Sequence, residues 1–191
     1  QRQMCIRDST WGVDCGMIDR EGNLLGMPGS YRDAALDEEN MNDVLASLVP
    51  EEQDRDKAVK AGEKYAFEQT GIASLAYNTL YKLCYLNKAM PEQMAAADKL
   101  LFMPNLIEYL FSGVVHSEYS IASTSQLLDM KEKKWASELI RKAGIDPKLL
   151  APLDYAGKDL GPLRPEIAKE VGQENLHILS VSFYSGRRHL C

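Results

Sequence analysis

Apolar and polar positions follow a strand-like pattern at the start of the chain and a helical pattern afterwards. Residues 13–17 alternate along the backbone, which predicts a strand. Residues 19–23 contain the Asp, Gly and Asn that are typical of a turn. Leu24 and Leu25 then begin a second short strand, which Gly26 closes. We therefore expect a β-hairpin at the start of an α/β domain.

Most of the remaining chain has apolar residues every three or four positions, the spacing of amphipathic helices. Proline near the start and glycine after the end mark several of the boundaries. The apolar run 100–103 is compatible with a buried strand or with a helix end. The predicted helical stretches are 37–68; one with Leu80, Leu83, Cys84 and Asn87 beside a stripe of Tyr77, Tyr81 and Tyr85; one from Pro91; one from Pro104 to Gly113; one with Trp135, Leu139, Ile140 and Ala143, ended by Gly144; and one over 166–171.

A segment rich in hydroxyl side chains covers residues 117–129. Ser123 and Gln126 have the spacing of a capping box, so we interpret this segment as a loop that leads into a helix start. A hydroxyl-lined binding loop is the alternative interpretation. Further along, residues 160–163 are typical of a turn and residues 176–183 of a strand, and a basic end without periodicity follows.

The composition narrows the class of protein. The chain has 191 residues, of which 45% are hydrophobic and 26% charged, and these values predict a globular domain rather than a disordered chain or a coiled coil. The net charge of −6 argues against nucleic-acid and membrane partners, which both require a basic face. Because the chain shows no apolar run of membrane-spanning length and no signal peptide, we expect a soluble, cytoplasmic protein.

The negative charge is concentrated in one segment. Residues 37–68 hold ten acidic and four basic residues, which accounts for the net charge of the whole chain. A solvated helical face is the interpretation that we favour. A protein-docking insertion is the alternative.

The cysteines and histidines are scattered and form no metal-binding or redox motif. Because no two cysteines have CxxC spacing, reduced thiols are favoured over a disulfide framework. The histidines are isolated, which favours ordinary surface or core positions over metal ligation. The cysteines are Cys5, Cys15, Cys84 and Cys191, and the histidines are His116, His177 and His189.

Trp11 beside Gly12 offers a flat apolar ring next to open backbone at the start of the first strand. Sugars bind to such surfaces because their C–H faces pack on aromatic rings while backbone N–H and C=O groups bind their hydroxyls. The alternative is a core tryptophan beside a glycine that the backbone conformation requires. The spacing alone favours that alternative.

A series of motifs shifts this balance toward a sugar-binding surface. The motifs occur in collinear order, and the pattern resembles the FGGY family of carbohydrate kinases and, within it, most closely the rhamnulokinases. The resemblance covers residues 10–172. The first signature pattern of the family is nearly met by Tyr77, Thr79, Lys82, Leu83 and Leu86. The chain departs from this pattern at two positions, where Tyr85 replaces an expected Trp and Ala89 replaces a polar residue. The motifs are TWGVD from position 10, DREGNLLG from 19, YRD from 31, YNTLYKL from 77, LFMP from 101, SEY from 117, ASTSQLLD from 122 and LGPL from 160.

The resemblance implies an α/β fold, the partial first domain of an actin-like, ribonuclease-H-like sugar kinase, with a short sheet and many helices. Such kinases have two domains: sugar binds to the first and ATP with Mg²⁺ between the two. They phosphorylate a sugar hydroxyl, here a primary hydroxyl of L-rhamnulose or a related ketose, and an Asp accepts its proton.

The motif match also implies the residues that contact the small-molecule sugar. Gly12 falls at the sugar contact of the rhamnulokinases, with Trp11 beside it. Tyr31 and Tyr77 fall where related sugar kinases place aromatic contacts, and Asn78 is a further candidate. For the neighbouring Arg32 and Asp33 we favour a structural ion pair. No residue of this chain is assigned a catalytic or metal-ligating role.

The ends of the chain depart from the family pattern. Residues 1–9 match no family motif, and we interpret them as a leader foreign to the family and a possible artefact. Residues 10–172 form the partial N-terminal domain, and residues 173–191 resemble an off-frame tail. The glycine-rich phosphate hairpin and the His-Asp-Thr motif with the catalytic base are both missing from the printed sequence.

From these departures we expect a fragment that is inactive alone. ATP and Mg²⁺ belong to the complete enzyme and are not expected to bind this chain tightly. Its expected partner is the missing C-terminal ATP-binding domain of the same protein. The alternative function is a non-catalytic sugar-binding or protein-interaction module.

Overall fold

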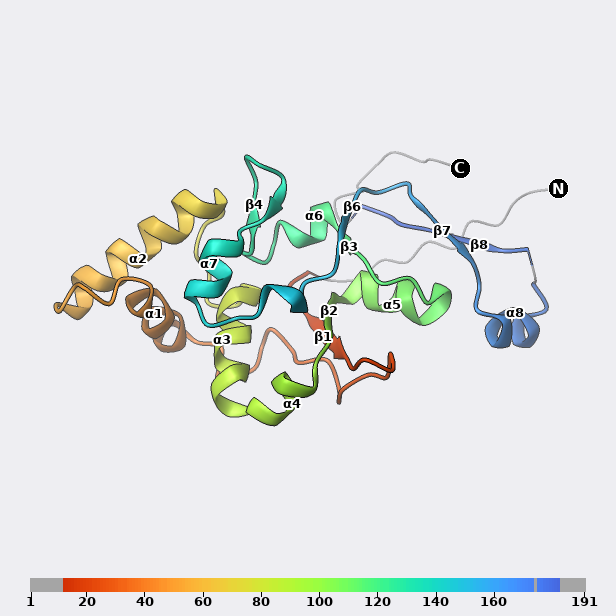
Figure 1. The fold of residues 1–191 in the computed structure, drawn as a ribbon, viewed down its shortest axis with the longest axis horizontal. Coiled ribbons are helices and arrows are strands. Elements are labelled where there is room, and N and C mark those ends of the chain that lie inside the picture. Colours follow the sequence, from red (N-terminus) through yellow and green to blue (C-terminus); the bar gives the residue numbers. More distant parts are fainter. Residues whose placement is uncertain (1–11, 174, 183–191) are drawn as a thin grey trace.

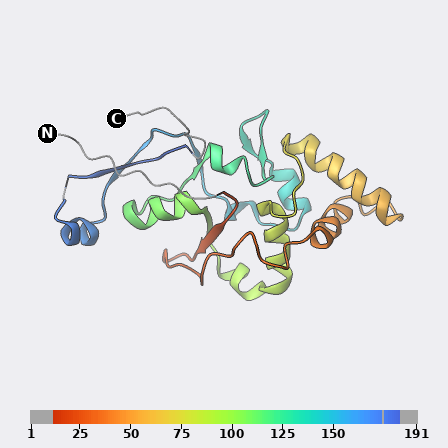
Figure 2. The same ribbon diagram turned by 180° about the vertical axis from the view of Figure 1, so that it is seen from behind.

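The computed structural model describes residues 12–173 and 175–182 of the 191-residue chain. Short strands and helices form an elongated molecule with β1, β2 and α3 near its middle (Figure 1). Helices α1 and α2 form one end, and α8 with β7 and β8 forms the other, as the reverse view also shows (Figure 2). The elements are β1 (Cys15–Ile18), α1 (Glu38–Ser47), α2 (Arg55–Thr70), α3 (Thr79–Ala89), α4 (Pro91–Ala96), β2 (Lys99–Phe102), α5 (Met103–Ser112), β3 (Ser117–Glu118), α6 (Tyr119–Ala122), β4 (Leu128–Asp129), β5 (Lys134–Trp135), α7 (Ser137–Lys142), η1 (Pro147–Leu149), β6 (Leu153–Asp154), β7 (Asp159–Pro162), α8 (Pro165–Val171) and β8 (His177–Leu179).

Strand β1 pairs antiparallel with β2, a strand from much later in the chain, with Cys15 opposite Phe102. A parallel bridge between Leu100 and Leu150 extends this pairing on the far side of β2. The apolar run 100–103 is therefore strand except for its last residue, Met103, where α5 begins. All residues of β1 and β2 except Lys99 are buried, which agrees with the apolar character of the two strands.

The predicted β-hairpin is confirmed at its turn and only partly in its second strand. The amide of Asp19 donates to the carbonyl of Asn23 at 2.9 Å, which closes the turn. Beyond it, Ile18 and Leu24 form a single antiparallel bridge instead of a ladder. Gly26, with a φ of 72°, then bends the backbone, so the second strand stays short.

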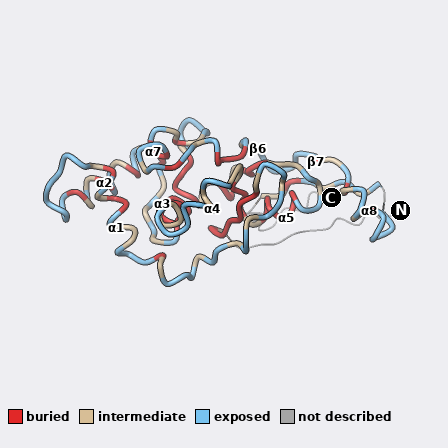
Figure 3. The backbone as a smooth tube through the Cα atoms, turned by 60° about the horizontal axis from the view of Figure 1, so that its bottom comes forward, coloured by how far each residue is buried: buried red, intermediate tan, exposed pale blue. Residues whose placement is uncertain are grey.

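The core lies in the middle of the molecule, where the buried parts of the backbone gather (Figure 3). Its main cluster joins side chains from α1, α3, β2, α6 and α7. A second, smaller cluster lies between β1, β2 and α5. The fully buried side chains of the main cluster include Leu45, Leu80, Leu83, Phe102, Ile121, Leu127 and Leu139.

The predicted helical stretch 37–68 forms two helices that pack closely. Asp37 and Asp54 cap the N-termini of α1 and α2 with their side chains. The backbone carbonyl of Leu45 lies so close to Gly62 that a Cβ at this position would overlap it. Glycine in the middle of α2 is therefore required by the approach of α1, despite its low helix propensity.

The acidic side chains of these two helices point mainly to solvent, and several pair within the segment. Arg55 lies 2.7 Å from Asp43, and Lys64 lies 3.8 Å from Glu68. These exposed pairs agree with the favoured interpretation of a solvated helical face.

Several other helices begin and end close to the prolines and glycines that predicted their boundaries. Helix α4 begins at Pro91, and α5 begins one residue before Pro104 and ends at Gly113, which has a φ of 80°. Helix α8 over Pro165–Val171 also confirms the predicted short helix. These boundaries were predictable because capping depends on residues next to each other in sequence.

The helix start predicted at Ser123 is wrong. Helix α6 begins at Tyr119, and Ser123 lies at its C-terminal end. The side chain of Glu118 is the N-cap and accepts hydrogen bonds from the amides of Ser120 and Ile121. The Ser123 hydroxyl instead donates to the carbonyl of Ser120 at 2.7 Å, so it serves the end of α6 and not the start of a later helix.

Three further predictions need correction. Trp135 lies on β5, outside helix α7, and its indole N–H donates to the carbonyl of Ala151 at 2.9 Å. Residues 160–163 lie mostly in β7 rather than in a turn, and the irregular pairing of β7 absorbs Gly161, whose φ is 90°. The predicted strand 176–183 is reduced to β8, His177–Leu179, and its last residue lies outside the described residues.

No helix in the described part of the chain is long and apolar enough to cross a membrane.

Candidate functional site

The loop that enters β1 has a strained backbone. Val13 has a φ of 65°, and the amide of Asp14 donates to the carbonyl of Gly12 at 2.9 Å across it. A three-residue turn with positive φ at its centre is rare, and a β-branched residue at that centre is an outlier. Strain of this kind persists only where the surrounding structure imposes it, and it concentrates at functional sites. Gly12 is half-buried at the start of this loop, and Trp11 lies outside the described residues.

Tyr31 and Tyr77 are far apart in the sequence and meet in the structure. Their ring centroids lie 6.3 Å apart with the rings nearly perpendicular, the edge-to-face arrangement that aromatic pairs prefer. Tyr31 is half-buried and Tyr77 is 40% exposed, so this pair presents an aromatic surface to solvent. The structure thus brings together two of the predicted sugar contacts.

The predicted ion pair between Arg32 and Asp33 is wrong. The guanidinium of Arg32 lies over the ring of Tyr31 and donates from Nε to its hydroxyl at 2.9 Å. The carboxylate of Asp33 instead accepts from the amide of Ala35 at 3.0 Å. Adjacent residues point in different directions at this turn, so Arg32 contacts the Tyr31 side chain and Asp33 accepts a hydrogen bond from the backbone.

Asn78 is buried at 3% exposure, and both ends of its amide have backbone partners. Its Oδ1 accepts from the amide of Leu75 at 2.6 Å, and its Nδ2 donates to the carbonyl of Thr124 at 2.8 Å. Asn78 therefore ties the start of α3 to the hydroxyl-rich segment. In this position its amide is occupied by the backbone and is not presented to solvent.

Lys82 also belongs to this region, although the motif from position 77 that contains it predicted no role for it. Its side chain is 4% exposed, and its Nζ lies 3.3 Å from Oδ1 of Asp14, itself 6% exposed. The same ammonium donates to the carbonyl of Gly29 at 2.8 Å. A usable signal was present in the sequence: Lys82 stands in an apolar stretch of the predicted helix, next to Leu83 and Cys84, and a lysine buried in such a stretch needs a partner.

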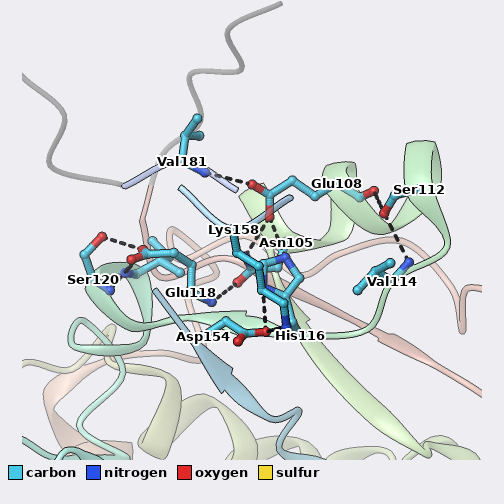
Figure 4. Close-up of polar contacts among 11 residues, drawn as sticks. Asn105, Glu108, Ser112, Val114, His116, Glu118, Ser120, Asp154, Lys158 and Val181 are labelled. Atoms are coloured by element: carbon cyan, nitrogen blue, oxygen red, sulfur yellow. Dashed lines mark hydrogen bonds and ion pairs between the residues drawn. The ribbon is translucent and has the colours of Figure 1, made fainter. Parts of the chain in front are cut away.

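A second buried polar cluster lies between α5, β3 and the segment after β8 (Figure 4). Glu108 of α5 is 2% exposed and accepts from Asn105 at 3.0 Å and from the amide of Val181 at 3.2 Å. Its Oε2 also lies 2.8 Å from Nε2 of the buried His116. Oδ1 of Asn105 accepts from the amide of Glu118 at 3.1 Å. The cluster therefore joins the C-terminal part of the described chain to α5.

The rest of this cluster extends to the surface. Asp154 pairs with Lys158 at 2.6 Å, and its Oδ2 lies 4.0 Å from Nδ1 of His116. That Nδ1 is buried and makes no hydrogen bond within the described structure. The hydroxyl of Ser120 lies 3.0 Å from that of Ser182.

The hydroxyl-rich segment does not present its side chains as a binding surface. Ser123, Thr124 and Ser125 each donate to a carbonyl three residues earlier, at 2.6 to 2.8 Å. They satisfy the last turn of α6. The alternative of a hydroxyl-lined binding loop is therefore not supported at these three positions.

The two described thiols are structural. Burial raises the pKa of Cys15 to about 11 and that of Cys84 to about 12, so both stay protonated at neutral pH. Both are free and buried, which confirms the prediction of reduced thiols for these two positions, while Cys5 and Cys191 lie outside the described residues.

Among residues 12–173 and 175–182, no group of three or more His, Cys, Asp or Glu side chains is arranged to hold a metal ion.

The chain is similar in sequence to known carbohydrate kinases. Residues 51–183 match the profile described as FGGY family of carbohydrate kinases, N-terminal domain. The chain is 30% identical over 173 residues to a rhamnulokinase of Bacteroides thetaiotaomicron, covering 91% of this chain and 33% of that protein. It is 33% identical over 152 residues to a rhamnulokinase of Pectobacterium atrosepticum, covering 80% and 28%. The chain thus spans about a third of the length of the curated relatives that it matches.

Solved structures agree on the fold. A ligand-bound xylulose kinase from Lactobacillus acidophilus superposes with a TM-score of 0.73 at 18% identity, over 92% of this chain and 33% of that chain. A glycerol kinase from Plasmodium falciparum, solved with ADP, superposes with a TM-score of 0.69 at 12% identity, over 91% and 33%. The expected α/β fold of the actin-like, ribonuclease-H-like sugar kinases is confirmed.

Proposed function

The chain belongs to the FGGY family of carbohydrate kinases, and from this membership we propose that it forms the sugar-binding part of a kinase acting on L-rhamnulose or a related ketose. The kinase transfers a phosphoryl group from ATP to a primary hydroxyl of the sugar, with Mg²⁺ on the phosphates. The names of the relatives in two bacterial species support the choice of L-rhamnulose as the first sugar to test.

The observation that carries this proposal is the meeting of Tyr31 and Tyr77. Their perpendicular rings offer one flat face and one edge, and the C–H face of a sugar ring or chain packs well on such a surface. The guanidinium of Arg32 holds the Tyr31 ring through its hydroxyl, so this part of the surface is preorganised.

The strained loop supplies the polar side of the same proposed site. The amide of Asp14 is used inside the turn at Val13, while Gly12 is half-buried with no Cβ to block the approach of a ligand. Backbone groups in such a loop bind hydroxyls with fixed geometry, which is how a sugar site distinguishes between ketoses. Trp11 is part of the proposal as the neighbour of Gly12.

A titration followed by calorimetry or NMR tests the proposal. We expect the folded chain to bind L-rhamnulose saturably and more tightly than L-rhamnose, and the Tyr77→Ala variant to lose about 5- to 12-fold in affinity, since an aromatic contact contributes about 1–1.5 kcal/mol. Tyr155→Ala is the matched control, because Tyr155 is exposed and stacks on Tyr119 in another region. Binding of no ketose by the folded wild-type chain would contradict the proposal.

Phosphate transfer is tested separately. With MgATP and L-rhamnulose, we propose that the chain alone binds sugar but releases no ADP above the rate without sugar. Sugar-dependent ADP release by the pure chain would overturn this part of the proposal and leave the sugar site in place. Sugar binding that is unaffected by addition of a nucleotide-binding partner domain would instead favour the non-catalytic sugar-binding module.

A further inference from the structure

We propose that Lys82 and Asp14 are positioning residues for the sugar site: one buried ion pair sets the relative placement of the three segments that carry the described site residues. This inference rests on the proposed function, because it assigns a role within that site. It names residues that touch other parts of the protein rather than the sugar itself.

The geometry joins the three segments at a single ammonium group. Lys82 itself belongs to α3, whose N-terminus follows Tyr77 directly. Its Nζ lies 3.3 Å from Asp14, which closes the strained loop. It also donates at 2.8 Å to the carbonyl of Gly29, two residues before Tyr31. Movement of this nitrogen therefore shifts the loop at Val13 and both tyrosines relative to each other.

The backbone around the pair strengthens this coupling. Cys15, next to Asp14, forms an antiparallel bridge with Gly29, so the two anchors of the ammonium lie on neighbouring backbone segments. The carbonyl of Asp14 also accepts from the amide of Met103 at 3.0 Å. The carboxylate is thus attached to a residue whose backbone is fixed by the start of α5, and the lysine reaches it from α3.

Stability alone does not explain a buried pair at this position. Replacing a buried ion pair by well-packed apolar residues is often neutral or stabilising, because taking two charges out of water costs as much as their attraction returns. Lys82 lies in the part of α3 where residues 79–84 are all buried, so an apolar side chain there would pack without that cost. A directional contact, from ammonium to carboxylate and to one carbonyl, fixes geometry in a way that an apolar contact does not.

The expected effect is a loss of sugar affinity without a matching loss of fold. Displacement of binding groups by about 1 Å costs on the order of 10²-fold where geometry matters. For the double variant Asp14→Asn with Lys82→Met, which leaves no unpaired buried charge, we expect sugar affinity to fall by about 10- to 100-fold. Lys82→Arg keeps the charge and changes the shape of the donor, and we expect it to fold and to lose affinity as well.

Lys99→Met is the matched control. Lys99 also lies beside an aspartate, Asp98, at 3.4 Å and donates to the carbonyl of Lys148 at 2.8 Å, but it is at the far end of β2 from the proposed site. We expect this variant to bind sugar as the wild type does. A loss of affinity equal to that of the Lys82 variants would show a general effect of removing a lysine and overturn the inference.

The direct readout of positioning is the contact between the rings of Tyr31 and Tyr77, followed by nuclear Overhauser effects between them. We expect the contact in the wild type and in Lys99→Met, and its weakening in Lys82→Arg and in the double variant. If both of these variants keep the ring contact and the wild-type affinity, the inference is wrong and the sugar site stands. If the wild type binds no ketose, the proposed function fails, and the ring contact alone decides whether Lys82 positions the two segments.

Discussion

Two buried charged clusters solve the same physical problem in different ways. The pair of Asp14 and Lys82 is compact and holds two opposite charges with one backbone carbonyl. The cluster around Glu108 spreads one carboxylate over an amide side chain, a backbone amide and the ring of His116. The compact pair fixes the geometry of a few segments, whereas the extended cluster shares its charge among many.

The difference has consequences for how each region responds to change. In the compact pair, the loss of either residue takes the opposite charge away from a buried charged group. In the extended cluster, the carboxylate keeps other hydrogen-bond partners when one is lost. We therefore expect the compact pair to be the more sensitive of the two to a single substitution.

The largest expected effect is the removal of one charge from the compact pair. Lys82→Met leaves the carboxylate of Asp14 buried without its ammonium, and we expect the free energy of unfolding to fall by about 3–5 kcal/mol. Urea denaturation followed by circular dichroism measures this loss. The double variant with Asp14→Asn is expected to recover most of it. A double variant as unstable as Lys82→Met would contradict the compact-pair description.

The next effect is a loss of stability at alkaline pH that originates beside the compact pair. Burial raises the pKa of Cys15 from 9.0 to about 11, with Lys82 lowering it and Asp14 raising it to smaller extents. Because the folded state holds the proton more tightly than the unfolded state, this contribution is fully present below pH 9 and is lost as the pH rises through about 11. The loss from this thiol amounts to roughly 3 kcal/mol.

The measurement is the free energy of unfolding at several pH values from 8 to about 11 for the wild type and for Cys15→Ala. Other buried groups also contribute, since burial raises the pKa of Cys84 and of Tyr81 to about 12. We therefore expect Cys15→Ala to decline less steeply with pH than the wild type rather than to be flat. Equal slopes for the two proteins would show that the Cys15 thiol is accessible to water.

The smallest of these effects is a change in the extended cluster. Glu108→Gln keeps the shape of the side chain and replaces one acceptor by a donor, which then faces either Val181 or the pair of Asn105 and His116. We expect a loss of about 1–3 kcal/mol, the cost of one unsatisfied buried donor, and thus less than for Lys82→Met.

Thermal unfolding of Glu108→Gln beside Glu166→Gln makes the comparison, since Glu166 is exposed on α8 and its substitution should change little. The segment after β8 is attached to Glu108 through Val181, so hydrogen exchange should increase there first. A loss larger than that of Lys82→Met would reverse the ranking of the two clusters.

Local features were predictable from the sequence where neighbours along the chain decide the structure. Pro91 and Pro104 mark helix starts and Gly113 a helix end, because the caps and the backbone dihedrals involve adjacent residues. The apolar spacing of α3 also predicted the helix that presents Leu80 and Leu83 to the core. The family was predictable as well, since its motifs occur in the same order along the chain.

Features that depend on contacts between distant segments were missed or left open. The pairing of β1 with β2 was not predicted, because the sequence of a buried strand does not name its partner. The helix start at Tyr119 was missed because its N-cap is Glu118, whereas the spacing of Ser123 and Gln126 indicated a later start. Lys82 was quoted as a motif residue without a role, since its partners come from two other segments.

The amino-acid sequence by itself determined most of the helices, the helix ends marked by proline and glycine, and the membership of a sugar-kinase family. These depend on periodicity, capping and motif order, which are local or collinear properties. The tertiary structure alone decided that Tyr31 meets Tyr77, that Lys82 meets Asp14 and that Glu108 meets His116. The first two contacts join segments far apart in the sequence, and the third joins α5 to the segment that follows it, so only the packing of the chain brings these side chains within reach.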